Sequence, residues 1–173
     1  FILEKIVFEE SNDFEEVINL FEKKKINCWV NCHSRAEHRY QFIYRKIQRD
    51  YPINIDILYP QDFNLGSAMI HCLDLFCYLS HDYEVNMDLS GIKKELFPSK
   101  HAGCVEIKGD LLAKNSSGDQ ISIKSGDVNS QTYRIQNGEN IFISCESEDF
   151  IMHNGAKISS PFLWQNRLTN LFL

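Results

Sequence analysis

Hydrophobic residues in the first third of the chain switch twice between strand-like and helical spacing. Residues 2–8 combine apolar and β-branched side chains and predict a short strand, and residues 26–33 predict a second one. After each strand the apolar positions recur every three or four residues, which predicts helices that begin at Asn12 and at Ser34. The second helix is expected to end at residues 50–52, because the segment closes with a proline.

The middle of the chain predicts one strand and one strongly apolar helix. Residues 53–58 alternate isoleucine with other side chains, so one face of this strand is expected to be buried. Residues 65–79 are apolar on nearly every side of a helix, which predicts that neighbouring elements enclose it all round.

Beyond Tyr83 the hydrophobic period changes to two, which is typical of strands. The segments that predict strands are residues 83–89, 104–114, 120–124, 131–135, 140–145 and 150–153. Glycine-containing turns at residues 115–118 and 136–139 predict antiparallel hairpins. A last helix is expected to begin near Ser159.

This order of elements predicts an α+β fold, with a largely antiparallel, mixed β-sheet and helices packed on one face. The other face of such a sheet is either solvated or covered by a partner. Isoleucines alternate along two predicted strands at Ile121, Ile123, Ile141 and Ile143. We expect this face to be covered by a second copy of the chain, so that the protein is a homo-oligomer.

The composition is that of a folded globular protein. The 173 residues are 43% hydrophobic and 24% charged, so a real core can form. The net charge of -6 disfavours nucleic acids and anionic membranes as partners. The longest apolar stretch, residues 70–79, contains His71 and Asp74 and is far shorter than the ~20 residues that a membrane helix needs. We therefore expect neither a nucleic-acid partner nor a membrane span.

Six cysteines occur along the chain without a metal-binding pattern. A chain of this size folds without disulfides and shows no secretory signal, so we expect free thiols and a cytoplasmic location. Cys28 and Cys32 lie four residues apart, but neither a Cys-x-x-Cys motif nor a histidine pair at zinc spacing accompanies them. The sequence therefore predicts no metal site.

One row of polar side chains crosses the predicted apolar helix. Ser67, His71, Asp74 and Tyr78 are separated by four, three and four residues, so they share one helical face. In one interpretation, His71 and Asp74 satisfy each other or a backbone carbonyl inside the core. In the other, His71 faces a pocket as a general base, because an imidazole can accept a hydroxyl proton near neutral pH.

Two shorter motifs come earlier in the chain. Glu4 and Lys5 lie in the first predicted strand and are followed by Ile6. Asn31 and Arg35 lie where the second predicted strand passes into the next helix. Arg35 could donate hydrogen bonds to an anionic or polyhydroxyl substrate, or it could be a solvated helix arginine.

The order of these motifs resembles that of the Gfo/Idh/MocA family of oxidoreductases, which includes glucose-fructose oxidoreductase and inositol dehydrogenase. In that family the second domain carries a segment Gly…Asp-x-Gly-x-His-x-x-Asp. Gly66, His71 and Asp74 match this segment, while Ser67 replaces an aspartate and Met69 replaces a glycine.

The amino-terminal motif fits the same resemblance. The family's nucleotide-binding Rossmann domain ends with a Glu-Lys-Pro strand, whose lysine enters the active site. Glu4 and Lys5 match this strand, and Ile6 departs from it.

The resemblance implies a reversible hydride transfer between NAD or NADP and a hydroxyl carbon of a sugar, an inositol or a nucleotide-sugar. Lys5 would polarise the reacting oxygen and contact the cofactor, and His71 would exchange the hydroxyl proton. The residues implied to bind substrate are Ser67, Arg35, Asn31 and Asp74.

The same resemblance implies a division of the chain. Residues 1–10 would be the end of the nucleotide domain and its connection, and residues 11–173 a single α+β substrate-binding and oligomerisation domain. No two of the eight glycines are separated by one residue, so the motif G-x-G-x-x-G is absent. We therefore expect a Rossmann domain elsewhere in a longer protein, and no binding of NAD or NADP by this chain alone.

A non-enzymatic interaction module is the alternative. Ser67 orients a histidine less strongly than an aspartate would, and Ile6 replaces the family's proline. In this alternative the active site is degenerate, the sheet face serves association, and the polar stripe is a hydrogen-bond network of the core.

Overall fold

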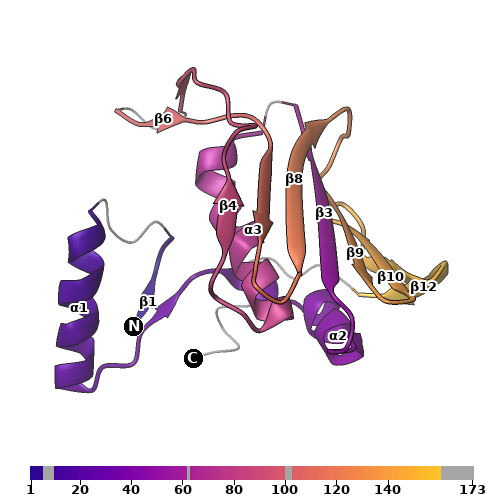
Figure 1. Cartoon of the computed structure of the whole chain (residues 1–173), viewed down its shortest axis with the longest axis horizontal. Coiled ribbons are helices and arrows are strands. Elements are labelled where there is room, and N and C mark those ends of the chain that lie inside the picture. The colour runs from indigo at the N-terminus through magenta and orange to yellow at the C-terminus, as the bar shows by residue number, and fades with distance from the viewer. Residues whose placement is uncertain (6–9, 62, 100–102, 161–173) are drawn as a thin grey trace. The chain divides into compact units, whose positions relative to one another are not determined.

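The computed structural model describes residues 1–5, 10–61, 63–99 and 103–160 (Figure 1). Contacts within the chain divide it into two units, residues 1–32 and residues 33–173. The predicted division after residue 10 differs from this one, because the first helix belongs to the first unit. The assignment of the two parts to a nucleotide domain and a substrate domain stays a prediction.

The first unit is a single strand–helix–strand motif. Strand β1 (Ile2–Leu3) pairs in parallel with β2 (Trp29–Val30), and helix α1 (Ser11–Lys24) connects them. Both strands are shorter than the apolar runs predicted. The helix begins after Glu10 rather than at Asn12, so the predicted asparagine cap is wrong.

The second unit begins with two short helical elements and a long strand. A 3-10 turn η1 (His33–Ala36) precedes helix α2 (His38–Lys46), so the predicted helix start at Ser34 is a tighter turn. The helix ends at Lys46, before the proline segment. Strand β3 (Ile53–Pro60) and helix α3 (Leu65–Ser80) follow close to their predicted positions.

Beyond α3, all secondary-structure elements in the described part of the second unit are strands. These strands are β4 (Asn86–Asp88), β5 (Phe97–Pro98), β6 (Val105–Glu106), β7 (Leu111–Lys114), β8 (Gln120–Gly126), β9 (Thr132–Asn137), β10 (Asn140–Cys145), β11 (Phe150–His153) and β12 (Ala156–Ser159). Gly118 and Gly138 take positive φ angles of 88° and 58° in the two predicted hairpin turns, a conformation that glycine adopts without strain. Ser159, the predicted start of a last helix, instead ends β12, and the rest of that helix lies outside the described residues.

Strand β3 and seven of these strands form one mixed sheet in the order β12-β11-β10-β9-β3-β8-β7-β4 (Figure 1). All neighbours pair antiparallel except β3 and β8, which run parallel. Strands β5 and β6 form a separate two-stranded sheet. The predicted α+β class with a mixed, largely antiparallel sheet is confirmed.

Helices α2 and α3 pack on one face of the sheet and share a single core with it. Ile55 and Ile57 of β3 lie beside Ile121 and Ile123 of β8, and all four side chains are almost fully buried. The core residues that the helices contribute include Tyr40, Ile43, Leu75, Phe76 and Leu79.

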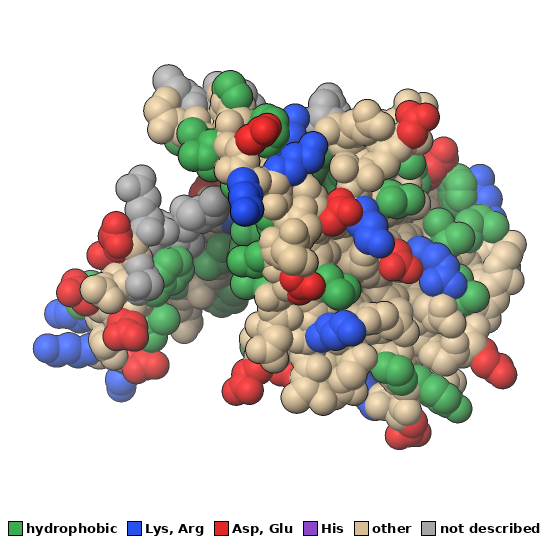
Figure 2. Space-filling view, turned by 45° about the horizontal axis from the view of Figure 1, so that its top comes forward, with side chains coloured by type: hydrophobic (Ala, Val, Ile, Leu, Met, Phe, Trp, Pro, Cys, Tyr) green, Lys and Arg blue, Asp and Glu red, His purple; other side chains and the backbone are tan. Residues whose placement is uncertain are grey.

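The structure corrects the prediction that Ile121, Ile123, Ile141 and Ile143 share one open face of the sheet. Ile121 and Ile123 point toward the helices, whereas Ile143 is 42% exposed on the other face. Beside it, Arg134 forms an ion pair with Asp56 at 3.6 Å. Figure 2 likewise shows acidic, basic and hydrophobic side chains interspersed on the second unit. The open face is therefore mixed rather than uniformly apolar.

Candidate functional site

The polar stripe of the sequence lies on α3 as expected. Ser67, His71, Asp74 and Tyr78 are all half-buried, while the core face of the helix is buried against the sheet. The helix is not enclosed on every side, because Ile70 is 38% exposed. The stripe is therefore neither solvated nor part of the deepest core.

The 3-10 turn η1 lies along this stripe and pairs with it at two points. Nε of Arg35 donates to Oδ2 of Asp74 at 2.9 Å, and a second guanidinium nitrogen contacts Oδ1, so the pair is bidentate. The Arg35 guanidinium carbon also lies 5.8 Å from the centre of the Tyr78 ring. Asp74 is thus bound by an arginine of the preceding turn.

The second point of contact joins two histidines. The rings of His33 and His71 have centroids 5.4 Å apart and are tilted by 43°. On its other side, Nδ1 of His33 lies 3.2 Å from Oε1 of Glu37. Sequence reasoning missed His33, because no local spacing links this turn to a helix that lies far along the chain.

A buried ionic cluster continues from Glu37. Its Oε2 lies 3.3 Å from Nε of Arg39, whose side chain is only 1% exposed. The Arg39 guanidinium also donates to Oγ of Ser144 and to the carbonyl of Cys145, each at 3.0 Å. Arg39 therefore ties the start of α2 to the end of β10.

Glu146 lies beside this cluster. Burial raises its pKa, and the neighbouring charge of Glu37 adds to the effect, while His33 and Arg39 oppose it. The amide of Gln131 satisfies its neighbours when its nitrogen donates to the Glu146 carboxylate, at 3.0 and 3.3 Å. The raised pKa favours the protonated form of this carboxyl group.

A hydrogen-bonded chain leads from Gln131 back to α3. In the same orientation the Gln131 oxygen accepts from the hydroxyls of Tyr133 and Tyr59, the latter at 2.6 Å. The Tyr59 hydroxyl lies 2.6 Å from Sγ of Cys72, the residue that follows His71. Burial raises the pKa of the Cys72 thiol to about 12, so this cysteine is a neutral core residue and not a nucleophile.

Ser67 lies in the first turn of α3, next to the carboxylate of Glu106 in strand β6. Its backbone N–H donates to Oε2 of Glu106 at 3.2 Å, and its hydroxyl donates to the carbonyl of Asn64 at 3.4 Å. A Cβ on Gly66 would lie 2.8 Å from the same Glu106 oxygen and 3.2 Å from Cγ1 of Ile107, so a larger residue there would require these side chains to shift. Position 67 has no aspartate, but the buried carboxylate of Glu106 lies at this helix start.

The remaining predicted residues belong to the first unit. The Asn31 side-chain amide donates to Oε1 of Glu4 at 2.7 Å, which joins the two amino-terminal motifs. Lys5 is half-buried. Four of the six predicted site residues belong to the second unit. Arg35 pairs with Asp74, and Asp74 shares helix α3 with His71 and Ser67. Lys5 and Asn31 belong to the first unit.

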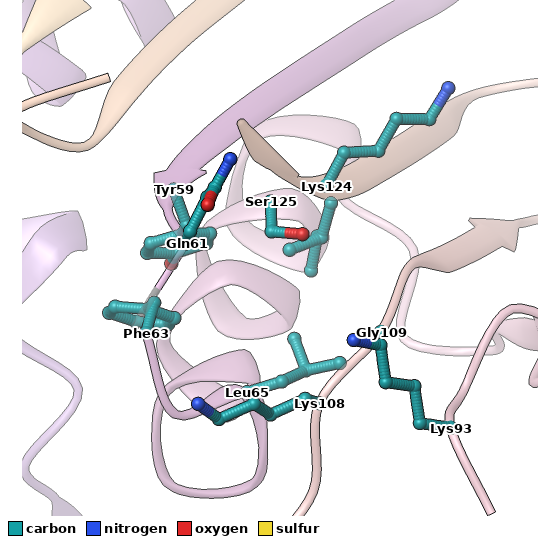
Figure 3. Close-up of a pocket in the computed structure, with 10 residues that line it drawn as sticks. Tyr59, Gln61, Phe63, Leu65, Lys93, Lys108, Gly109, Lys124 and Ser125 are labelled. Atoms are coloured by element: carbon teal, nitrogen blue, oxygen red, sulfur yellow. The ribbon is translucent and has the colours of Figure 1, made fainter. Parts of the chain in front are cut away.

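A small pocket opens at the carboxyl ends of the parallel strands β3 and β8 (Figure 3). The stacked rings of Tyr59 and Phe63 line one side, and the Lys93 amino group points inward while that of Lys124 points away. Its volume of about 30 Å³ can hold water but not a sugar. None of the predicted site residues lines it.

The first unit offers a poor fit for a dinucleotide. A helix that follows a strand binds a pyrophosphate through backbone N–H groups that a glycine-rich turn exposes. Here residues 6–9 contain no glycine, Glu10 stands at the helix start, and Asp13 lies in the first turn. These carboxylates repel an anion, so we derive no step through a nucleotide held by this chain.

In the part of the chain that the structure describes, no group of three or more His, Cys, Asp or Glu side chains is placed to hold a metal ion. No helix in the same part of the chain is long and apolar enough to cross a membrane. Within the same ranges Cys28, Cys72, Cys77, Cys104 and Cys145 form no disulfide.

The fold recurs in solved structures. A dehydrogenase (MviM) from Clostridium difficile aligns over 99% of this chain with a TM-score of 0.67 and 16% identity. UDP-N-acetylglucosamine 3-dehydrogenase GnnA from Acidithiobacillus ferrooxidans aligns over 98%, with a TM-score of 0.65 and 14% identity. The chain has the fold of the Gfo/Idh/MocA-type oxidoreductases.

A candidate myo-inositol dehydrogenase from Sinorhizobium meliloti 1021 extends this likeness, with 99% of the chain aligned, a TM-score of 0.63 and 13% identity. The chain covers 59%, 58% and 59% of these three Gfo/Idh/MocA-type structures, so it spans less than two thirds of their length. Neither a family model nor a curated protein matches the sequence. The resemblance inferred from the motifs is thus confirmed at the level of the fold.

Proposed function

We propose that this chain is the carboxyl-terminal, substrate-binding and oligomerisation domain of an NAD(P)-dependent oxidoreductase. Its substrate would be a hydroxyl or keto carbon of a sugar, an inositol or a nucleotide-sugar. The observation that carries the proposal is the pairing of η1 with the polar stripe of α3, which sets His71 beside the Arg35–Asp74 ion pair within this fold. A half-buried imidazole beside a fixed polar pair is suited to exchange a proton with a bound hydroxyl.

The first unit supports a further, nucleotide-binding domain. Its two strands pair in parallel over only two residues each, and Phe1, Trp29 and Ile18 are 75%, 61% and 54% exposed. A parallel strand pair is normally buried on both faces within a larger sheet. We infer that further strands extend this unit into a Rossmann-type sheet, and that NAD or NADP binds there.

The proposed roles follow from the chemistry of each side chain. His71 takes the hydroxyl proton in the oxidation direction and returns it in the reduction direction. Lys5 would polarise the reacting oxygen, as the resemblance implies. Arg35 and Asp74 position the substrate hydroxyls, with Ser67 and Asn31 as further polar contacts.

Assembly and location complete the proposal. The open face of the sheet carries exposed apolar side chains, Leu58 and Ile143, among its polar ones. We propose that a second copy covers this face, and that the protein works in the cytoplasm with its thiols reduced.

The test is an activity screen of the full-length protein. Purified protein would be supplied with NAD or NADP and a panel of inositols, free sugars and nucleotide-sugars, and reduced nicotinamide would be followed by absorbance. Turnover of at least one substrate that is lost in His71→Asn supports the proposal. Absence of turnover across the panel in both directions, in a folded protein, contradicts it.

One observation favours a second candidate, a non-enzymatic interaction module. Both oxygens of Asp74 are engaged by Arg35, and Ser67 stands where the family has an aspartate. In this module the stripe holds η1 against α3 and has no chemical role. His71→Asn would then change stability and leave the association of the sheet face intact.

A further inference from the structure

Glu106 of β6 places a buried carboxylate at the start of helix α3. The residue is 6% exposed, and its Oε2 accepts a hydrogen bond from the backbone N–H of Ser67 at 3.2 Å. A Cβ on Gly66 would lie 2.8 Å from the same oxygen, so the carboxylate packs directly against the first turn of the helix. Hydrogen bonds to a charged acceptor are usually shorter, about 2.7–2.9 Å. The Ser67 amide therefore satisfies this carboxylate only in part.

Most of the acceptor capacity of Glu106 is unused. An ionised carboxylate offers two oxygens with about four lone-pair sites. In the part of the chain that the structure describes, Oε1 accepts no hydrogen bond, and no basic side chain forms an ion pair with either oxygen. A buried charge with a single weak donor is costly, and further donors would offset that cost. The carboxylate is therefore suited to accept hydrogen bonds from a ligand.

The surroundings of Glu106 favour hydroxyl donors over a cation. The positive end of the α3 dipole lies beside the carboxylate and disfavours a metal ion or an ammonium group there. Lys108, two residues further on, instead places its amino group over the Phe97 ring, 5.1 Å from the ring centre. Phe97 pairs directly with Glu106 across β5 and β6, so an apolar ring lies on the same face as the carboxylate. A polyhydroxyl ring offers the hydroxyls and the apolar C–H edges that match such a site.

We propose that Glu106 binds the substrate, and that its carboxylate accepts hydrogen bonds from two adjacent hydroxyls of a polyhydroxyl ring. The inference rests on the proposed function for the identity of the ring, and it narrows the substrate to rings with two neighbouring free hydroxyls besides the reacting one. Ser67 and His71 are four residues apart on one face of α3, so hydroxyls held at Glu106 lie about one helical turn from the imidazole. Glu106 orients the ring and takes no proton.

A first experiment tests the contact in this chain without turnover. Millimolar myo-inositol should shift the NMR signal of the Ser67 amide, because this N–H donates to the carboxylate that the hydroxyls would bind. Cyclohexanol, which has one hydroxyl, is the control probe and should leave the signal in place. In Glu106→Gln the shift with myo-inositol should be lost, because a neutral amide is a weaker acceptor.

A second experiment measures substrate discrimination in the full-length protein, with a substrate found in the activity screen and its monodeoxy analogues. In the natural protein, two of these analogues should have a KM about tenfold higher than the parent, because each lacks a hydroxyl that a charged acceptor binds. Glu106→Gln should raise KM for the parent about tenfold with kcat within about twofold. The same two analogues should then have a KM within about twofold of the parent. A purely structural role would leave the penalty for the analogues unchanged.

The matched control is Glu95→Gln, because Glu95 is exposed two residues before β5 on the same side of the second unit's small sheet. It should change neither KM nor the penalty for the analogues. Circular dichroism checks the fold of each variant. Where Glu106→Gln does not fold, Glu106→Asp keeps the charge at the helix start and shortens the side chain by one methylene. This variant should lose the same discrimination.

The outcomes separate this inference from the proposed function. An unmoved Ser67 signal in the natural chain overturns the contact with adjacent hydroxyls, whatever the reaction. An equal penalty for the two analogues in the natural protein and in the folded variant overturns the role in substrate binding, while loss of turnover in His71→Asn leaves the proposed function standing. Full turnover in His71→Asn overturns the proposed function, and the NMR titration still decides whether Glu106 binds hydroxyls.

Discussion

Arg35 and Asp74 form a bidentate ion pair that joins the turn η1 to helix α3. Asp74 is 15% exposed and Arg35 39% exposed, so the pair lies at the boundary between the core and solvent. A guanidinium holds both carboxylate oxygens at once, which fixes the turn relative to the helix and with it the contact of His33 on His71.

The first prediction concerns this ion pair. Arg35→Lys should lower the free energy of unfolding by about 1 kcal/mol, because an ammonium cannot bind both oxygens and the pair is partly screened by solvent. Arg134→Lys is the matched control on the sheet face, where the ion pair with Asp56 is exposed, and should cost less than about 0.5 kcal/mol. Urea unfolding of the two variants measures both values, and equal losses would show that the bidentate geometry adds nothing.

The sequence could predict the elements whose signals are local. The periodic apolar run of α3 and the glycine turns of two hairpins were found because each depends on residues close together in the chain. The ends of elements were less accurate, since Asn12 and Ser34 look like caps while Glu10 and Glu37 hold those positions. Local sequence propensity indicates whether a segment is a helix or a strand, and tertiary packing determines the residue at which it begins.

The faces of the sheet and the partner of His71 could not be predicted in this way. Alternating isoleucines show that a strand has two faces, but not which face the helices cover. Ile121 and Ile123 lie beside Ile55 and Ile57, whereas Ile143 lies opposite Arg134, and only the strand register decides this. His33 likewise reaches His71 where η1 packs along α3, a contact between distant parts of the sequence that the Arg35–Asp74 pair supports.

The second prediction concerns Glu146 and pH. Its raised folded-state pKa means that the folded chain binds this proton more tightly than the unfolded one, so its stabilising contribution is present below the ordinary value of 4.5 and is lost as pH rises through the raised value. Glu146→Gln should therefore raise the free energy of unfolding at pH 7 relative to the natural chain, and change it little below pH 4.5. Thermal or urea unfolding at both pH values checks this, with Glu139→Gln as a control that shows no such difference.

The third prediction is that this chain alone binds neither NAD nor NADP. The strand–helix–strand motif of the first unit has no glycine at residues 6–9 and places Glu10 and Asp13 at the helix start, where a pyrophosphate would be repelled. Calorimetric titration of the chain with each nucleotide should show no heat of binding. Micromolar affinity for either one would refute the prediction.

The fourth prediction concerns association through the open sheet face. Sedimentation at tens of micromolar should show a dimer or a larger assembly of the chain, and Ile143→Asp should shift it to monomer, because a carboxylate would be buried against the second copy. Leu96→Asp is the control, since Leu96 is 66% exposed just before the separate sheet of β5 and β6. A natural chain that sediments only as a monomer would rule this assembly out.

The last prediction assigns the acid-base role to His71. Of the histidines that the structure describes, His71 lies on α3 in the polar stripe, where η1 supports it through His33 and the Arg35–Asp74 pair. His71→Asn should keep the fold and lower turnover of the full-length protein by about 10²- to 10⁴-fold, the usual contribution of a positioned general acid or base. Ser67→Asp should keep the fold, because the positive end of the α3 dipole offsets the repulsion from the neighbouring Glu106 carboxylate. Circular dichroism of each variant separates loss of chemistry from loss of fold. Unchanged turnover in His71→Asn, or unfolding of that variant, would instead identify His71 as a residue of the core network.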